Sequence, residues 1–280
     1  MPFILVVGDI IADVALHGSV SRLNPEGPGI VFDVERTEVS PGGAGAVAML
    51  CRSLGADVML VGNSHDDGWS EKVKLKLDAA GVVGFYTPVP TSKMNGKLRR
   101  FVDGRPLYDR IDFSAFEAPI TLPTADAQAW PFVVVVADYG KGSMANGLTE
   151  IRDRWPRAQI IVDPARGVSW QRYRSADIIK CNRSESLEPG FDATCAKITI
   201  VTDGGNGMEL RLNGENQIIP TKRLTPIDPT GCGDTVMAVL GVSMSKSMVV
   251  MEACRLANVA AGIQCQRAGV QPIRWEEIER

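Results

Sequence analysis

A glycine-rich segment near the C-terminus of this 280-residue chain has the composition of a phosphate-binding turn. Residues 228–235 read Asp-Pro-Thr-Gly-Cys-Gly-Asp-Thr and lead into the apolar stretch Val236–Val242, which is typical of a helix. Glycines let the backbone turn tightly beside a ligand, and the free N–H groups of a helix start attract anions. Asp234 falls in the first helical turn, where a carboxylate either accepts a proton or simply caps the helix.

A second run of small residues, Pro-Gly-Gly-Ala-Gly-Ala-Val-Ala, occupies positions 41–48. Small side chains at the start of a helix permit a substrate to approach the backbone closely. The same composition also suits tight packing of a helix on a sheet, so this run by itself does not distinguish a binding site from a packing contact.

The elements that must position these segments follow from short apolar runs that alternate with helical patterns. This alternation indicates an α/β fold with a doubly wound, mostly parallel sheet flanked by helices. Ligands of such sheets collect at the carboxyl ends of strands, where Asp9, Asp138, Asp163 and Asn182 fall. The predicted strands are Phe3–Val7, Ala56–Gly62, Phe132–Asp138, Gln159–Asp163, Ile178–Asn182 and Lys197–Thr202, with a hairpin of Met208–Leu212 and Gln217–Pro220 at Asn213-Gly214. The predicted helices are Gly43–Leu54, Gly68–Ala80, Met144–Trp155, Gly233–Met244 and Val249–Arg267.

Two segments do not fit this alternation of strands and helices. Their patterns predict strands with one buried and one solvent-exposed face. They are Ile30–Val39 and a hairpin over Leu98–Phe113 that turns at Asp103-Gly104. An exposed sheet of this kind must be covered or paired, so we expect a homodimer formed through these strands.

The domain organisation expected from these elements is simple. We expect residues 1–280 to form a single domain, with a small β-sheet lid from about residues 14–40 and 95–114.

The overall composition excludes several classes of protein. A net charge of −3 and a pI near 5.6 give no general attraction to nucleic acid or anionic lipid, so we expect neither as a partner. Asp9 and Asp13 interrupt the apolar N-terminus, which therefore predicts a buried strand and a turn rather than a signal peptide. No run approaches the ~18 apolar residues of a membrane span. The six cysteines lack metal-ligand spacing, so we expect reduced thiols, no structural zinc and a cytoplasmic location.

The two glycine-rich segments, in this order, resemble the two signatures of the PfkB-type (ribokinase-like) carbohydrate kinases. The resemblance covers nearly the whole chain and is strongest to the heptose 7-phosphate kinases, the sugar-kinase half of a bifunctional enzyme of lipopolysaccharide-precursor synthesis. Motifs similar to that group are Ser-Arg-x-x-Pro-Glu-x-Pro at 21–28, Lys-x-Arg at 97–99 and Arg-x-Asp at 110–112. Segments similar to the wider family are 138–142 (Asp-Tyr-Gly-Lys-Gly), Asp163-Pro164, Asn-x-x-Glu at 182–185, the glycines after Thr202 and the run 257–262.

The resemblance implies an ATP-dependent kinase whose base, Asp234, takes the proton from an acceptor hydroxyl, the 1-hydroxyl of a heptose 7-phosphate. The N–H groups of Gly231, Cys232 and Gly233 would stabilise the charge on the transferred phosphoryl group. Mg²⁺ bridging the ATP phosphates is expected as well. The remaining implied residues are Asp13, Gly42 and Gly43 for the sugar; Thr202, Gly204, Gly207 and Asn258 for the nucleotide; Asn182 and Glu185 for magnesium, held through water; and Asp228 and Thr230 for K⁺, which is common in the family.

Basic residues on the lid are candidates for holding a phosphate already present on the substrate. They are Arg22, Lys97, Arg99 and Arg110, and arginine suits this role because its planar fork pairs two oxygens at once. Each of them is explained equally well as a solvated charge on an exposed face. A polar strand end followed by a helix cap is likewise an alternative interpretation of the Asn-x-x-Glu motif.

Two departures from the family pattern keep other functions open. Ala46 stands where the first signature usually carries an Asn that bonds sugar hydroxyls, and residues 186–197 read as a turn where the family has a helix. The alternatives are another sugar or nucleoside kinase of the same fold, or a catalytically silent sugar- or nucleotide-binding relative. An oxidoreductase has little support, since Gly8-Asp9 is not followed by a Gly-x-Gly-x-x-Gly fingerprint.

Overall fold

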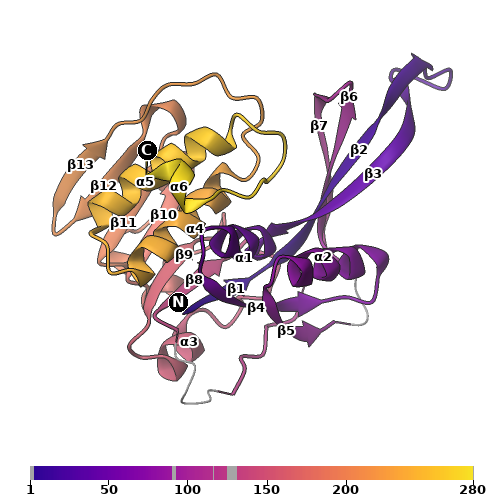
Figure 1. The fold of residues 1–280 in the computed structure, drawn as a ribbon. Helices are drawn as coiled ribbons and strands as arrows, with labels where there is room; N and C mark the ends of the chain where they lie inside the picture. The colour runs from indigo at the N-terminus through magenta and orange to yellow at the C-terminus, as the bar shows by residue number, and fades with distance from the viewer. Residues whose placement is uncertain (1–2, 90–92, 116, 125–130, 280) are drawn as a thin grey trace.

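A large sheet runs through the centre of the molecule in the computed structural model, which describes residues 3–89, 93–115, 117–124 and 131–279 (Figure 1). Within these ranges its strands, in spatial order, are β13 (Glu215–Ile219), β12 (Met208–Leu212), β11 (Ile198–Thr202), β10 (Ile178–Asn182), β9 (Gln159–Asp163), β8 (Val133–Ala137), β1 (Phe3–Gly8), β4 (Asp57–Ser64) and β5 (Val83–Pro88). Neighbours from β11 to β5 are parallel, whereas β12 and β13 are antiparallel. The predicted α/β sheet is therefore present.

Helices cover both faces of this sheet, because alternate side chains of a buried strand point to opposite sides. Ile4 and Val6 of β1 lie in the core beneath α1, α4 and α5, and Leu5 and Val7 lie in the core beneath α3. The bounds of these helices are α1 (Ala44–Ser53), α3 (Thr149–Arg154), α4 (Cys232–Ser245) and α5 (Val250–Gln264).

A second sheet projects from the body of the molecule as the expected lid (Figure 1). Among the described residues its strands, in spatial order, are β3 (Ile30–Gly43), β2 (Ile10–Leu23), β6 (Gly96–Val102) and β7 (Arg105–Phe113). Strands β2 and β6 are parallel, and the outer pairs are antiparallel. The hairpin turn is confirmed at Asp103 and Gly104, which both have positive φ (48° and 74°), as a tight turn between twisted strands requires.

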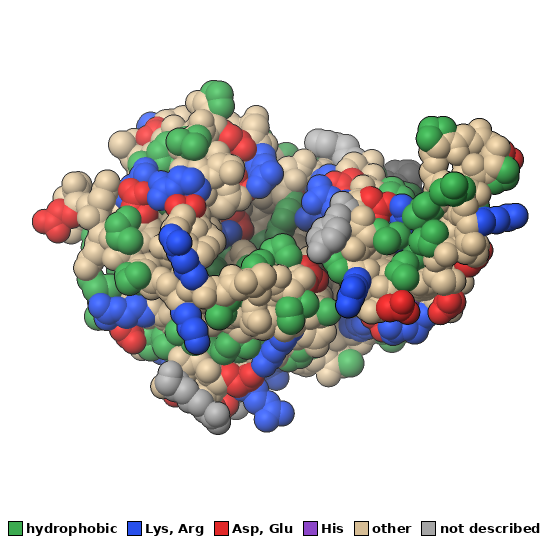
Figure 2. All heavy atoms as spheres, turned by 90° about the horizontal axis from the view of Figure 1, so that it is seen from above, with side chains coloured by type: hydrophobic (Ala, Val, Ile, Leu, Met, Phe, Trp, Pro, Cys, Tyr) green, Lys and Arg blue, Asp and Glu red, His purple; other side chains and the backbone are tan. Residues whose placement is uncertain are grey.

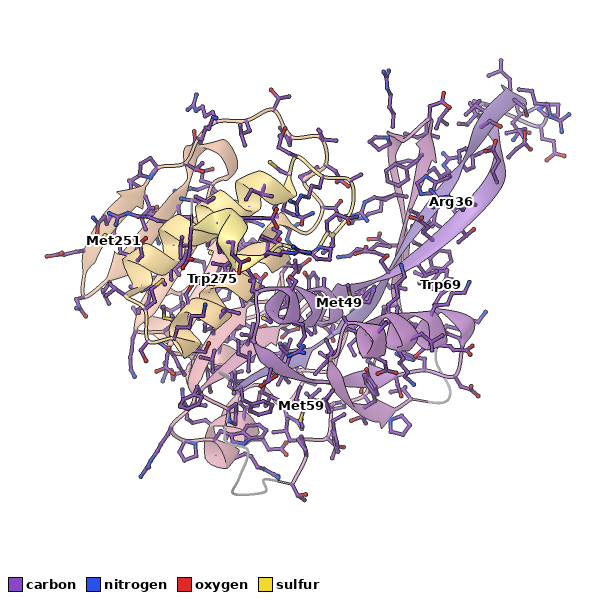
Figure 3. The ribbon with its side chains drawn as sticks, in the orientation of Figure 1. Arg36, Met49, Met59, Trp69, Met251 and Trp275 are labelled. Carbon is purple, nitrogen blue, oxygen red and sulfur yellow. The ribbon has the colours of Figure 1, made fainter. Side chains whose placement is uncertain are left out.

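The base of the lid rests on helix α2 (Gly68–Ala79). Trp69, near the start of α2, meets the ring of Phe113 edge to face with 5.1 Å between ring centroids (Figure 3). A Cβ on Gly96 would lie 2.5 Å from the Trp69 ring, so only glycine lets β6 pass this close to the helix. The indole therefore supports the lid where it leaves the body.

Several predicted elements differ from the structure. The turn expected after β1 is wrong, since β2 begins at Ile10 directly after Asp9. The helix predicted over Met144–Trp155 is reduced to α3, because Gly147 adopts a φ of 67° that a helix interior does not tolerate. Strand β5 and the short helix α6 (Trp275–Ile278) were not predicted. Residues 185–195 form 3₁₀ turns rather than a helix, in agreement with the sequence.

Across the part of the chain that the structure describes, no helix is long and apolar enough to cross a membrane.

Candidate active site

Asp234 lies buried in the first turn of α4. Its Oδ1 accepts a hydrogen bond of 2.5 Å from the phenol of Tyr139. Burial raises the pKa of Asp234 to about 6; the Tyr139 bond acts against this increase, and the carboxylates of Asp163 and Asp13 add to it. A carboxylate with a pKa near neutrality can take a proton from a hydroxyl at physiological pH.

The turn that leads into α4 depends on glycine. Gly231 caps the helix with a φ of 78°, and a Cβ there would lie 2.6 Å from Cγ2 of Val270. A Cβ on Gly233 would lie 3.2 Å from the Lys180 ammonium. The Cys232 N–H donates a long bond of 3.3 Å to the Pro229 carbonyl, so this predicted donor is already used within the turn. The helix start remains open to close approach by an anion.

Lys180 places a positive charge beside this helix start. The side chain comes from the centre of β10, is buried, and lies 2.7 Å from Oδ2 of Asp163. Burial alone would lower the pKa of Lys180, but the carboxylates of Asp163, Glu185 and Asp234 together outweigh burial and raise it. The ammonium therefore stays charged beside the Gly231–Gly233 turn.

The lid supplies the opposite wall of the site. Asp13 of β2 has its Oδ1 3.2 Å from Nη1 of Arg99 on β6, and burial raises the Asp13 pKa against the influence of Arg99 and Lys97. A Cβ on Gly42 would lie 2.5 Å from Asp13 Oδ2, which explains the glycine at this position. The Lys97 ammonium lies 4.5 Å from the centroid of the Tyr139 ring, in a cation–π contact.

A cavity of about 170 Å³ separates the lid from the loops that flank α4 and α5. The molecule is visibly hollowed between these two parts when it is viewed from above (Figure 2). The lining brings together Asp13 and Arg99 from the lid with Asp228 and Thr230 from the turn before α4. The lid and the turn before α4 therefore meet at this cavity.

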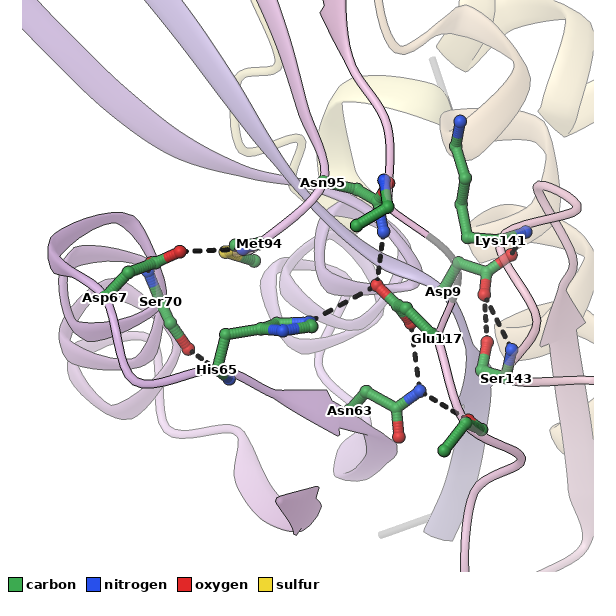
Figure 4. A network of polar contacts seen from close by, with 12 residues as sticks. Asp9, Asn63, His65, Asp67, Ser70, Met94, Asn95, Glu117, Lys141 and Ser143 are labelled. Carbon is green, nitrogen blue, oxygen red and sulfur yellow. Dashed lines mark hydrogen bonds and ion pairs between the residues drawn. The ribbon is translucent and has the colours of Figure 1, made fainter. Parts of the chain in front are cut away.

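A buried polar network anchors the lid beside this site (Figure 4). The carboxylate of Glu117 accepts hydrogen bonds from the amides of Asn95 (2.6 Å) and Asn63 (3.0 Å), and His65 Nε2 lies 3.4 Å away. Asn95 in turn accepts the N–H of Ala12 at its backbone carbonyl, at 2.8 Å. The network thus joins the end of β4 to the roots of two lid strands.

Asp9 holds the loop that carries Tyr139. One carboxylate oxygen accepts the N–H groups of Tyr139 (2.7 Å) and Lys141 (3.1 Å), and the other accepts hydrogen bonds from Ser143 (Figure 4). Burial raises the pKa of Asp9 to about 6, although the Ser143 bond opposes this. This side chain, at the carboxyl end of β1, therefore shapes the site through the loop at 138–143.

Arg22 and Arg110 are not among the residues that line this cavity. Arg22 is exposed near the far end of β2, and Arg110 is exposed on β7, where it pairs with Asp112 at 2.7 Å. Neither lines the cavity, which Arg99 does. Ala46 is fully buried in α1 and offers the site no polar group.

Asn182 and Glu185 bond to each other at the carboxyl end of β10. The Asn182 N–H donates to Glu185 Oε2 at 2.8 Å, and the Glu185 N–H donates to Asn182 Oδ1 at 3.0 Å. The Arg166 guanidinium lies 2.9 Å from Glu185 Oε1. This is the reciprocal capping that the sequence left as an alternative; it also fixes an oxygen-rich pair, which is the donor chemistry that Mg²⁺ prefers.

A second cavity, of about 210 Å³, lies on the other side of the α4 start. Gly204, Cys232 and Asn258 line it, so the predicted nucleotide side adjoins the predicted phosphate turn. The Asn258 amide donates to the Ile219 carbonyl at 3.1 Å. Gly207 does not line this cavity; a Cβ there would be 2.2 Å from the Ile219 carbonyl oxygen, so it is required for packing. The Thr202 hydroxyl, at the end of β11, donates to the Cys181 carbonyl at 3.2 Å.

The Asp228 side chain stabilises the loop before α4 through hydrogen bonds to backbone N–H groups. Its carboxylate accepts the N–H groups of Thr230 and Gly269, each at 2.9 Å. Burial would raise the pKa of Asp228, but the Thr230 side chain, the N–H groups of Gly269 and Thr230 and the charge of Arg99 together outweigh burial and lower it. K⁺ at Asp228 and Thr230 remains a prediction. In the described ranges, no group of three or more His, Cys, Asp or Glu side chains is placed to hold a metal ion.

Sequence reasoning missed the roles of Tyr139 and Lys180 in the geometry of this site. Tyr139 belongs to a motif that was noted without a function for its side chain, and its partner Asp234 is 95 residues away. Lys180 had a visible signal, a single lysine between the apolar residues of a buried strand. A buried cation at this depth requires a partner, and Asp163 provides it.

Comparisons with known proteins show the family and the fold of this chain. The family model for pfkB family carbohydrate kinases matches residues 1–277. The chain is 32% identical over 302 residues to the bifunctional protein HldE of Edwardsiella ictaluri; the match covers 99% of this chain and 62% of that protein. The chain therefore spans about three fifths of the length of that relative.

Solved structures of ribokinase-like proteins share the fold. Ribokinase from Arabidopsis thaliana, complexed with ribose and ATP, superposes with a TM-score of 0.73 at 20% identity, covering 99% of this chain and 97% of that one. A nucleoside kinase of Burkholderia thailandensis in complex with inosine gives a TM-score of 0.74 at 21% identity, covering 98% and 94%. The predicted ribokinase-like fold and family are confirmed, and the chain is a carbohydrate kinase of the pfkB family.

Proposed function

We propose that this kinase transfers the γ-phosphoryl group of ATP to the 1-hydroxyl of a heptose 7-phosphate or a closely similar sugar phosphate. The observation that carries the proposal is the position of Asp234, a buried carboxylate in the first turn of α4. It follows a turn whose residues Asp228 and Thr230 line the lid-side cavity and whose residue Cys232 lines the second cavity. Relatives that match along the whole chain, and a structural neighbour complexed with ribose and ATP, support sugar and ATP as the two substrates.

The transfer step needs a base and a positive environment. Asp234 takes the proton of the acceptor hydroxyl as that oxygen attacks the γ-phosphorus and the bond to ADP breaks. The Gly231 and Gly233 N–H groups and the α4 dipole stabilise the negative charge on the moving group. The Lys180 ammonium, which lies beside Gly233, adds a full positive charge.

Magnesium fits this arrangement as a partner of ATP. Asn182 and Glu185 would hold it through water, and when bound it neutralises charge on the ATP phosphates. The protein contributes a fixed carboxylate oriented by the Asn182 N–H at 2.8 Å.

The acceptor binds on the lid side in this proposal. Asp13 and the backbone at Gly42 and Gly43 contact sugar hydroxyls, and Lys97 and Arg99 face a phosphate on the sugar. Support comes from the lid motifs at 97–99 and 21–28 and from the position of Arg99 in the cavity wall. ATP lies on the other side, along the cavity lined by Gly204 and Asn258.

Another sugar or nucleoside kinase activity is the second candidate. Arg22 and Arg110 do not line the cavity, which leaves fewer cations for a sugar phosphate than the sequence predicted. Ala46 cannot supply the amide that the family pattern carries. A catalytically silent relative is the third, and it requires that Asp234 has lost its role.

An acceptor panel separates these candidates. ATP-to-ADP turnover with Mg²⁺ is measured against heptose 7-phosphate, fructose 6-phosphate, ribose, fructose and inosine, and phosphorus NMR identifies the hydroxyl that is modified. Turnover of the heptose 7-phosphate at its anomeric position supports the proposal. Turnover confined to unphosphorylated sugars or to the nucleoside refutes it in favour of the second candidate.

We also propose a homodimer formed through the lid. The lid exposes apolar side chains that a monomer would leave in water: Val20, Leu23, Val34, Ile111 and Phe113. A second copy of the lid is the occupant that matches this apolar face and pairs its outer strands. A cytoplasmic location follows from the need for ATP and agrees with six unpaired cysteines.

A further inference from the structure

Tyr139 contacts the lid, the body of the protein and the carboxylate of Asp234. We propose that Tyr139 is a positioning residue: its phenol fixes Asp234 through Oδ1 and leaves Oδ2 to receive the proton of the acceptor hydroxyl. The inference rests on the proposed function, in which Asp234 is the base.

The contact between the two side chains is direct and short. The Tyr139 hydroxyl donates to Asp234 Oδ1 at 2.5 Å, a distance typical of a hydrogen bond to an ionised acceptor. Burial, together with the Asp234 carboxylate, raises the pKa of Tyr139 well above its usual range, so the phenol remains a donor. A carboxylate held at one oxygen has a single orientation, which a base must have to meet a hydroxyl in line with a phosphate.

The body of the protein holds Tyr139 in place. The Tyr139 N–H donates to the buried carboxylate of Asp9 at 2.7 Å, so the backbone of the loop is tied to the end of β1. A Cβ on Gly43 would lie 3.3 Å from the Tyr139 ring, which means that the ring packs directly on the glycine signature at the start of α1. The phenol is therefore placed by rigid elements rather than by a free loop.

The lid holds the other side of the ring. Lys97 comes from β6, and its ammonium lies 4.5 Å from the ring centroid. Tyr139 thus contacts a proposed acceptor-binding residue and the proposed base at once. Its ring and its phenol together link a lid residue to Asp234.

Removal of the phenol should change the pKa of Asp234 in one direction, upward. A hydrogen bond to the ionised form favours that form, so its loss raises the pKa of the carboxylate. The charged and titratable groups that act on Asp234 are otherwise unchanged by a Tyr139→Phe substitution. They are Asp13, Lys97, Asp163, Lys180 and Cys232.

The test compares wild type with Tyr139→Phe in the substrate-free protein. Titration of ¹³C-labelled aspartate carboxyls by NMR, with the Asp234 signal assigned from its absence in Asp234→Asn, gives the midpoint of Asp234. We expect the midpoint to rise by about one pH unit in Tyr139→Phe. With the acceptor that wild type phosphorylates fastest, kcat should fall about tenfold even above both midpoints, while the KM for ATP stays unchanged.

A matched control is available in Tyr173→Phe. Tyr173 is another buried phenol, and its hydroxyl donates to Asp138 at 2.7 Å rather than to Asp234. This variant loses a buried hydrogen bond but should leave the Asp234 midpoint where it is in wild type.

An unchanged Asp234 midpoint in Tyr139→Phe would overturn the inference, and so would full recovery of kcat at high pH. Failure of the proposed function gives a different result: wild type would then phosphorylate no acceptor, although the NMR titration would still report on the Tyr139 contact.

Discussion

At the scale of single residues, the buried carboxylate of Asp234 lowers the stability of the folded protein when it is ionised. Burial raises its pKa to about 6, so the folded protein binds a proton that the unfolded chain releases near the ordinary value of 3.8. A raised carboxyl pKa means that stability falls as pH increases through this interval. If Asp234 is the base, as proposed, the charge that it carries at neutral pH opposes folding.

The first prediction concerns this loss of stability. Asp234→Asn removes the buried charge. The free energy of unfolding of the variant minus that of wild type should therefore increase by about 1 kcal/mol from pH 5 to pH 8. Urea denaturation of both proteins at the two pH values measures the gap. A gap that stays constant, or narrows with pH, would mean that Asp234 has an ordinary pKa.

The second prediction concerns Lys180. Lys180→Met keeps the length of the side chain but removes the ammonium beside Gly233. We expect kcat to fall by about 10²-fold because charge on the transferred group loses a partner, whereas ATP is still bound. Steady-state kinetics on the acceptor identified by the panel, with calorimetry for ATP, measures both. Lys197→Met, which removes an exposed lysine paired with Asp177, is the control and should keep wild-type kcat.

At the scale of elements, the lid depends on the buried carboxylate of Glu117. The side chain is fully buried and receives two amide donors, from Asn63 and Asn95. Asn95 also accepts the N–H of Ala12 on β2 at 2.8 Å. A carboxylate has acceptors alone, so it satisfies both amides at once.

The third prediction follows from that requirement. Glu117→Gln places an NH₂ group against at least one amide donor and should lower the free energy of unfolding by about 1–3 kcal/mol. Urea denaturation gives the change, and Glu215→Gln, on an exposed position of β13, should show none. Equal stability of Glu117→Gln and wild type would show that the network does not anchor the lid.

Most elements with regular apolar patterns were predictable from sequence. The local sequence was sufficient to predict buried strands such as β8, which has four valines in succession, and the glycine turn before α4. Strand β2 did not, because its far half leaves the body and pairs only within the lid. The helix expected from Met144 failed at Gly147, whose φ of 67° depends on tertiary context.

The site was predictable where residues belong to a motif and unpredictable where they meet through the fold. Asp234, Asp13 and Gly42 were identified from their segments; Asp13 lines the lid-side cavity, and Gly42 lies against the Asp13 carboxylate. The contact of Tyr139 with Asp234 joins residues 95 positions apart, and the pairing of Lys180 with Asp163 joins two neighbouring strands. No local pattern encodes such pairs. Arg22 shows the converse, since a motif match did not bring its side chain to the cavity.

At the scale of the whole molecule, the lid forms one wall of the lid-side cavity and also exposes apolar side chains. Ile111 of β7 is 48% exposed, and Val20 and Leu23 of β2 are exposed as well. Strands so exposed invite pairing. In the proposed dimer this face is buried, and the lid is held by its partner as well as by the network at Glu117.

The fourth prediction tests the dimer. Ile111→Glu introduces a charge into the proposed interface and should convert a dimer into a monomer in light scattering at micromolar concentration. Ile218→Glu, at an exposed position of β13 outside the lid, should leave the mass unchanged. A monomeric wild type would contradict the proposal directly.

The central claim is that Asp234 is the base of an ATP-dependent sugar kinase, and sugar-dependent ADP formation by wild type and Asp234→Asn tests it most directly. The account predicts turnover on one acceptor, a loss of about 10³-fold in the variant, and ATP binding retained in both proteins. Wild-type turnover that persists in Asp234→Asn would contradict the claim, because the proton would then leave by another route.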